Sequence, residues 1–140
     1  MITLLSALFF CHFLADFTPL STTWMLQAKR VGLPLLPIMA HGFVHAWLQF
    51  LMVIIVLTWQ NPGDFASSHY IQLAGIVGII QFIVHTYADV AKGRLQALNP
   101  LVLNNPANVW HWALFGADQL VHALTIIAEV AFLQKHLSQL

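Results

Sequence analysis

Four long apolar stretches, separated by shorter polar segments, dominate the pattern of the chain. They cover about residues 2–17, 35–59, 70–90 and 112–133. A helix needs roughly 20 apolar residues to cross a bilayer, within a range near 17 to 25, so the last three stretches are long enough and the first is short. Apolar runs of this length predict helices rather than strands. We therefore predict an all-α, integral membrane four-helix bundle that forms a single transmembrane domain over residues 1–140.

The segments between the spans predict the topology. Residues 18–34 are amphipathic and contain a tryptophan, which favours a short helix lying along the membrane interface. Four of the five basic residues lie in this segment or between spans three and four, at Lys29, Arg30, Lys92 and Arg94. The positive-inside rule therefore places loops 18–34 and 91–111 in the cytoplasm and both termini outside.

Composition supports the membrane assignment and excludes several classes of protein. The chain is 59% hydrophobic and 7% charged, whereas soluble domains contain about a quarter charged residues. Its net charge is zero and it has no basic patch, so we expect no nucleic-acid partner. A single cysteine excludes an internal disulfide and any site built from several cysteines.

Each predicted span contains one pair of ionisable residues four positions apart. That spacing places both side chains on one helix face, about 6 Å apart. An aspartate at a helix centre costs about 2.5–3.5 kcal/mol on insertion scales, so such residues normally face a partner or a cavity. With alternating spans, the pairs share the cytoplasmic half of the bundle. The pairs are His12 and Asp16, His41 and His45, His85 and Asp89, and Asp118 and His122.

Five imidazoles and three carboxylates form a donor set that suits a divalent metal. The set exceeds the four ligands of a tetrahedral ion, so it fits one ion with a surrounding network, or two ions. Neutral imidazole with carboxylate favours Zn, Fe or Mn over Ca or Mg. Di-iron bundles typically use Glu-x-x-His motifs, which this chain lacks. We therefore predict zinc, with iron or manganese as alternatives, and all eight paired residues as metal ligands.

Neighbouring residues extend the predicted site. An aspartate that is free of metal could act as a general base. Lys92 lies three residues after Asp89, on the same face, and could hold an anionic group such as phosphate. Gln119 could orient a ligand beside Asp118, and His111, two turns before it, could guard the entrance. The candidate catalytic residues are Asp16, Asp89, Asp118 and Lys92.

The motifs HFLADF, HGFVH, HTYADVAK and DQLVH, in this order, resemble a bacterial family of small membrane proteins, the domain-of-unknown-function family 3307. The resemblance runs from about His12 to His122. It implies a multi-pass protein of the bacterial inner membrane and supplies no activity. By position it marks the same eight ligand candidates together with Lys92 and Gln119.

These features together predict a metal-dependent hydrolase that acts on a lipid-like or anionic amphiphilic substrate. One alternative is a metal-ion or proton transporter, although the outer halves of the spans are largely apolar. Another is a haem-binding or non-catalytic subunit of a larger membrane complex, in which the polar cluster only holds the helices together. We expect membrane lipids as partners, and the pattern leaves a homo-oligomer or a larger complex open.

Overall fold

The computed structural model describes residues 2–61 and 67–138. In this part of the chain 87% of the residues are helical and none forms a strand. The predicted all-α class is therefore confirmed. The helices are α1 (Ile2–Phe17), α2 (Thr23–Val31), α3 (Leu35–Gln60), α4 (Ser68–Leu98), α5 (Pro100–Leu103) and α6 (Val109–Leu137).

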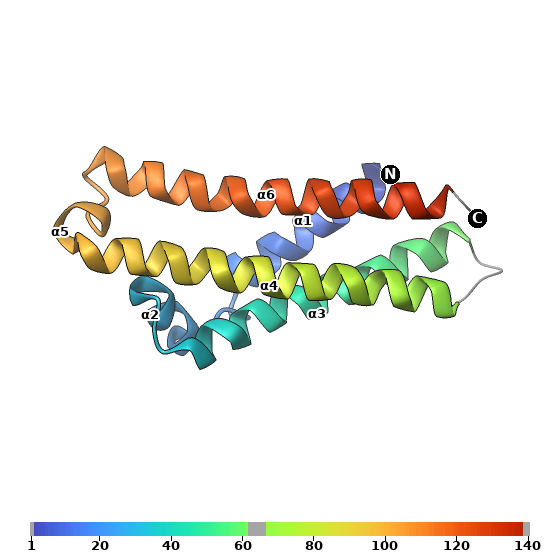
Figure 1. Cartoon of the computed structure of the whole chain (residues 1–140), viewed down its shortest axis with the longest axis horizontal. Helices are drawn as coiled ribbons and strands as arrows, with labels where there is room; N and C mark the ends of the chain where they lie inside the picture. The colour runs from blue at the N-terminus through green and yellow to red at the C-terminus, as the bar shows by residue number, and fades with distance from the viewer. Residues whose placement is uncertain (1, 62–66, 139–140) are drawn as a thin grey trace.

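The four longest helices, α1, α3, α4 and α6, form an elongated bundle, with α4 and α6 running along its whole length (Figure 1). The short helices α2 and α5 lie at one end. At the other end, α1 begins, α3 ends, α4 begins and α6 ends (Figure 1). Both chain ends therefore lie on the side opposite α2, which is the arrangement that four alternating spans require.

Three helices, α3, α4 and α6, are long and apolar enough to cross a membrane, and α1 is a shorter apolar helix of 16 residues. Helix α4 has 31 residues, or about 46 Å at 1.5 Å per residue. This length exceeds a hydrocarbon core of about 30 Å, so α4 is longer than an upright span needs to be. The sides of the membrane that the loops face stay a prediction.

Side-chain caps explain why α4 and α6 begin before the predicted spans. The Ser67 hydroxyl accepts a hydrogen bond from the backbone N–H of Tyr70. The Asn108 side chain accepts one from the backbone N–H of Trp110. Each cap satisfies one of the free N–H groups at a helix start and so extends the helix toward the loop.

Helix α2 packs directly on α4 through two glycines. Gly32 caps the end of α2, and its φ of 69° is the left-handed conformation that suits glycine. On α4, a Cβ atom at Gly93 would collide with the backbone of Lys29 and Gly32. The amphipathic segment after α1 thus folds back against the bundle, and this contact brings the end of α2 close to the bundle interior.

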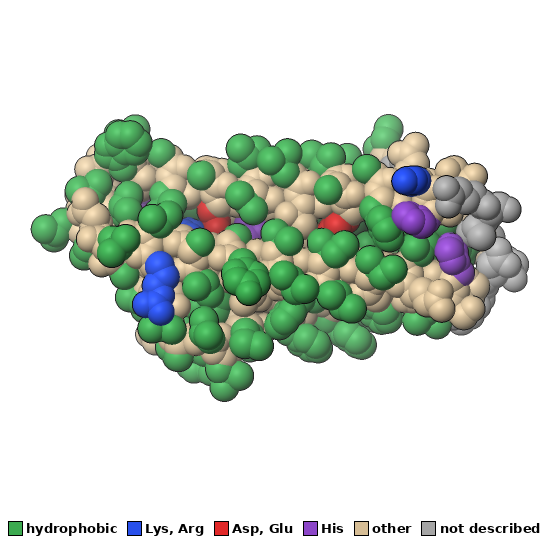
Figure 2. All heavy atoms as spheres, in the orientation of Figure 1, with side chains coloured by type: hydrophobic (Ala, Val, Ile, Leu, Met, Phe, Trp, Pro, Cys, Tyr) green, Lys and Arg blue, Asp and Glu red, His purple; other side chains and the backbone are tan. Residues whose placement is uncertain are grey.

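The bundle interior divides into an apolar part and a polar part. The apolar part fills the end where the chain begins, with Leu4, Leu8, Val53, Leu73, Val77, Ile126 and Leu133 among its buried residues. The polar part lies toward α2. In Figure 2 apolar side chains far outnumber charged ones on the face in view, as expected for helices that face lipid.

Candidate metal centre

The eight predicted ligand residues meet where α1, α3, α4 and α6 pack together beside α2. Seven of them are buried, and the side chain of the eighth, Asp16, is 7% exposed. Because each pair is spaced i, i+4, both of its side chains project from one helix face into this region. The structure therefore brings together residues as far apart in sequence as His12 and His122, which are 110 positions apart.

The first ligand group takes one atom each from Asp16, His41, His45 and His85, all within 4.8 Å of one another. Asp16 Oδ1 lies 3.1 Å from His41 Nε2 and 3.4 Å from His45 Nε2. The rings of His45 and His85 stack with their centroids 3.7 Å apart. Ligands about 2.1 Å from a tetrahedral zinc lie about 3.4 Å from each other, so this group is close to the spacing that zinc needs.

The second ligand group contains His85, Asp89 and His122, again with one atom each within 4.8 Å. His85 Nε2 lies 3.3 Å from Asp89 Oδ2, and the rings of His85 and His122 stack at 4.1 Å. His85 belongs to both groups. The cluster therefore offers two overlapping places for a cation, which suits one ion or an adjacent pair.

Two predicted ligands, His12 and Asp118, belong to neither group. The His12 ring lies 4.9 Å from the ring of His45 and 5.1 Å from that of His122, measured between centroids. Asp118 Oδ1 lies 3.5 Å from His122 Nε2, and Asp118 Oδ2 accepts a hydrogen bond from Lys92 Nζ at 2.7 Å. Both residues border the two groups.

Buried nitrogen atoms in the cluster lack hydrogen-bond partners among the described residues. This holds for both ring nitrogens of His12, His85 and His122. Leaving such a group unpaired costs about 1–3 kcal/mol. The lone pairs that these imidazoles leave free are ones that a metal ion could bind, and imidazole with carboxylate suits Zn, Fe or Mn. The donor set therefore fits a divalent metal.

Lys29 is part of the cluster, although the sequence indicated only that it sets the topology. Its Nζ lies 3.1 Å from Asp89 Oδ1, 3.2 Å from Asp16 Oδ1 and 2.8 Å from His41 Nε2. Burial disfavours the charged ammonium, but Asp89 and Asp16 outweigh that penalty and raise the pKa of Lys29 above its usual range. A charged ammonium only donates, so His41 Nε2 accepts this hydrogen bond.

Ser21 is a second residue that the sequence did not reveal. Its Oγ donates to the carbonyl of Ala15 at 2.7 Å and therefore accepts from His41 Nδ1 at 3.0 Å. The proton of His41 thus lies on Nδ1, and the lone pair on Nε2, to which Lys29 donates, faces the cluster, so an ion bound to His41 Nε2 would have to displace that hydrogen bond. Hydrogen bonds of this type orient metal-binding histidines. Neither Lys29 nor Ser21 lies in an apolar span, so no periodic signal pointed to them.

The charges of the cluster do not balance within the protein. Three aspartates, Asp16, Asp89 and Asp118, face two lysines, Lys29 and Lys92. With neutral imidazoles, three negative charges against two positive ones leave one in excess. Buried charges need compensation. A bound divalent cation would supply it.

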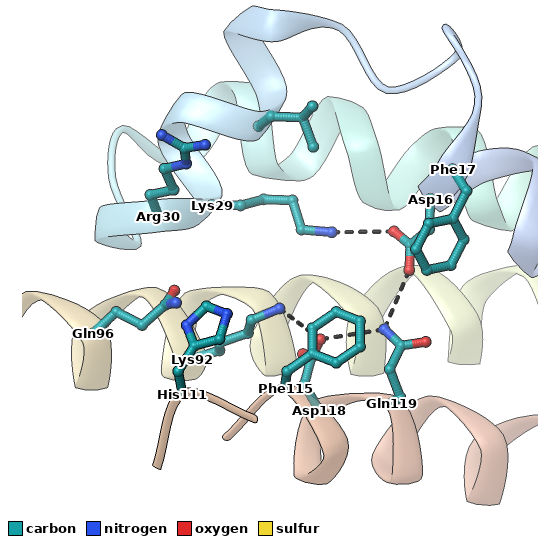
Figure 3. A pocket seen from close by; sticks show the side chains of 11 residues that line it. Asp16, Phe17, Lys29, Arg30, Lys92, Gln96, His111, Phe115, Asp118 and Gln119 are labelled. Carbon is teal, nitrogen blue, oxygen red and sulfur yellow. Dashed lines mark hydrogen bonds and ion pairs between the residues drawn. The ribbon is translucent and has the colours of Figure 1, made fainter. Parts of the chain in front are cut away.

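A cavity of about 280 Å³ opens beside the cluster. Figure 3 shows Gln119 between the two carboxylates of Asp16 and Asp118; its Nε2 donates to them at 3.5 and 3.4 Å. Lys92 and His111 also line this cavity. His111 Nδ1 donates to the carbonyl of Leu103 at 2.7 Å, so α5 holds it away from the ligand groups.

The family model described as "Protein of unknown function (DUF3307)" matches residues 4–140. The chain belongs to this family. The match includes α3, α4, α6 and all but the first two residues of α1, and it confirms the resemblance drawn from the motifs. Comparison with curated proteins and with solved structures finds no match. Membership in the DUF3307 family assigns no activity, so a functional conclusion depends on the geometry of the cluster.

Proposed function

We propose that this protein is a metal-dependent hydrolase of an amphiphilic substrate in the bacterial inner membrane. The observation that carries the proposal is the pair of overlapping ligand groups with unpartnered buried nitrogens. Asp16, His41, His45 and His85 would hold one ion, and Asp89 and His122, with the shared His85, would hold a second. A bound zinc ion supplies a Lewis acid that activates water and polarises the bond to be cleaved.

Asp118 is the candidate general base. Unlike Asp16 and Asp89, it lies outside both ligand groups, and it lines the cavity. Its Oδ2 accepts hydrogen bonds from Lys92 at 2.7 Å and from Gln119 at 3.4 Å, which orient the carboxylate toward that space. A carboxylate in this position can take a proton from water. Lys92 can hold a negative group of the substrate beside it.

Metal analysis of single variants tests the proposal and counts the ions. For two ions, we expect about two zinc per chain in the wild type and about one after His45→Ala or His122→Ala. His85→Ala should remove both ions, because His85 is shared by the two groups. The control is His136→Ala, at the other end of α6, where the ring forms a hydrogen bond with the backbone carbonyl of Phe132. Folded wild-type protein that takes up no Zn, Fe or Mn would overturn the proposal.

A second candidate function is transport of a proton or metal ion, and three buried residues favour it. Gln49 and Gln81 lie one helical turn outward from the histidines of α3 and α4, and Glu129 lies two turns outward on α6. All three are at most 2% exposed and have no hydrogen-bond partner among the described residues. These three residues are exceptions in outer halves that are otherwise largely apolar. Buried polar groups in series mark ion paths.

Flux through liposomes distinguishes transport from hydrolysis. Protein reconstituted in liposomes with an internal zinc or pH indicator should give no flux above empty liposomes if the protein is a hydrolase. Flux that is lost in Glu129→Gln, with the metal content unchanged, would favour transport instead. Glu129→Gln keeps the size of the side chain and removes only the ionisable group.

A further inference from the structure

The cavity beside the cluster has a basic mouth. Arg30, Gln96 and His111 lie at the end away from Asp16 and Gln119, and Lys92 reaches between the two ends (Figure 3). Arg30 is exposed, and the side chain of Lys92 is 17% exposed. This opening therefore favours an anionic group. Arg30 and Lys92 can form charge-assisted hydrogen bonds with an anion, which are stronger than hydrogen bonds between neutral groups, and Gln96 and His111 can form further hydrogen bonds.

An apolar groove adjoins this cavity between α4 and α6. Its volume is about 460 Å³, and its lining includes Ile83, Ala88, Ala91, Leu95, Ala117 and Val121. Lys92 and Asp118 line both the groove and the cavity. Acidic, basic and histidine side chains come into view along the seam between α4 and α6 (Figure 2). The site therefore opens sideways, through the surface of two helices that are candidate membrane spans.

The ion pair between Lys92 and Asp118 lies on the boundary of the two spaces. Lys92 Nζ is 2.7 Å from Asp118 Oδ2 and 5.4 Å from the centre of the Phe115 ring. Asp118 Oδ2 also accepts a hydrogen bond from Gln119. Lys92 can therefore turn to an incoming anion while Gln119 continues to hold the carboxylate.

We propose that the cavity and the groove together bind one lipid molecule, with a phosphate-type anionic headgroup in the cavity and an acyl chain in the groove between α4 and α6. The inference rests on the proposed function, because it names the substrate class of the same site. A free phosphate would use the basic mouth and leave the apolar groove without a role. The continuity of the two spaces through Lys92 and Asp118 therefore favours a lipid.

Comparison with a second apolar groove shows what distinguishes the groove between α4 and α6. The groove between α3 and α4, of about 310 Å³, is lined by Phe43, Trp47, Phe50, Gly75 and other uncharged residues. None of its described lining residues is charged, and none of them also lines the cavity that contains Arg30 and Lys92. An apolar groove alone accommodates any lipid tail, whereas the groove between α4 and α6 also leads to a binding place for a headgroup.

Binding of labelled lipids in nanodiscs tests the inference. Full-length protein in phosphatidylcholine nanodiscs is titrated with fluorescent phosphatidic acid and, separately, with diacylglycerol that has the same chains and label. Inorganic phosphate serves as a competitor that represents the headgroup alone. We expect phosphatidic acid to bind about tenfold more tightly than diacylglycerol or better, because only the former has a phosphate that can form charge-assisted hydrogen bonds with Lys92 and Arg30.

Three variants separate the headgroup from the chain. Lys92→Gln should weaken phosphatidic acid binding about tenfold and leave diacylglycerol binding unchanged. Ala117→Leu, which fills the groove between α4 and α6, should weaken lipid binding and leave competition by phosphate unchanged. Gly75→Leu is the matched control, because a Cβ atom there meets nothing within 4 Å and the side chain fills the other groove.

Phosphatidic acid that binds no more tightly than diacylglycerol would overturn the inference, and so would equal effects of Ala117→Leu and Gly75→Leu. Strong competition by phosphate with no effect of Ala117→Leu would indicate a site for a free anion and would overturn it as well. Zinc content measured on the same samples separates this inference from the proposed function. If the protein takes up no metal but binds phosphatidic acid, the lipid site stands and the metal-dependent hydrolase is contradicted. If the protein takes up metal but does not prefer phosphatidic acid, the metal centre stands and the lipid site is contradicted.

Discussion

Lys29 places a positive charge at a point where three acceptor atoms meet. Its Nζ lies within 3.2 Å of atoms of His41, Asp16 and Asp89. Removing one partner of a buried ion pair costs about 3–5 kcal/mol, because the other charge remains uncompensated. A bound metal would also compensate Asp16 and Asp89. Lys29 and the metal therefore stabilise the same two carboxylates.

Lys29→Ala should make the stability of the protein depend more strongly on metal. Without the ammonium, only the ion balances the two carboxylates, so the loss of unfolding free energy on chelation should grow by about 1–3 kcal/mol. Thermal unfolding in detergent, with and without chelator, measures this change. Arg30→Ala, an exposed position on the same helix, is the control. Equal chelation shifts in Lys29→Ala and the wild type would contradict this role.

Ser21 acts on the cluster through His41, whose Nδ1 proton it accepts at 3.0 Å. Ser21→Ala removes that acceptor and allows the imidazole to change its tautomer or orientation. We expect zinc affinity to fall about 10-fold to 100-fold, as for other hydrogen bonds that orient metal ligands. Competition with a chelating dye measures the affinity. Ser6→Ala, exposed on α1, should leave the affinity unchanged, and an equal fall in both variants would rule out the orienting role.

At the scale of elements, the contact between α2 and α4 decides whether Lys29 reaches the cluster. Gly93 has no space for a Cβ atom, because the backbone of Lys29 and Gly32 occupies it. Gly75, on the same helix, has open space at the corresponding point. The same substitution, glycine to alanine, can therefore be compared at a tightly packed position, Gly93, and at an open one, Gly75.

Gly93→Ala should push α2 away from α4 and destabilise the protein by about 1–3 kcal/mol, as overpacking does. Gly75→Ala should be neutral or should stabilise by up to about 1 kcal/mol, because alanine favours the helix. Thermal midpoints measure both changes, and chelation shifts report whether Lys29 has left the cluster. If Gly93→Ala were as stable as Gly75→Ala, the close packing of α2 would be wrong.

At the scale of the whole molecule, the bundle places α2 and the connection between α3 and α4 at opposite ends (Figure 1). In a Cys11→Ser background, single cysteines at Gln27 and Asn61, both exposed, report the two ends. With four spans and the basic residues inside, an impermeant maleimide should label Asn61→Cys in intact cells. It should label Gln27→Cys only after permeabilisation. Labelling of both from the same side would contradict four spans.

The sequence by itself determined the helices and the four polar pairs, because both follow from local periodicity. Apolar runs near 20 residues specify helices wherever they lie, and a spacing of four places His85 and Asp89 on one face in any helix. The caps at Ser67 and Asn108 are equally local. These features required no knowledge of which helices are neighbours.

Only the tertiary structure decided how the residues of the four polar pairs divide between the two ligand groups. Distances between separate helices decide that His85 belongs to two ligand groups and that Asp118 contacts Lys92. They also decide that Lys29 and Ser21 reach the cluster. Periodicity gives the direction of a side chain around its own helix and says nothing of the helix it meets. The groove between α4 and α6 depends on the packing of two helices in the same way, so it too follows from their approach and not from either sequence alone.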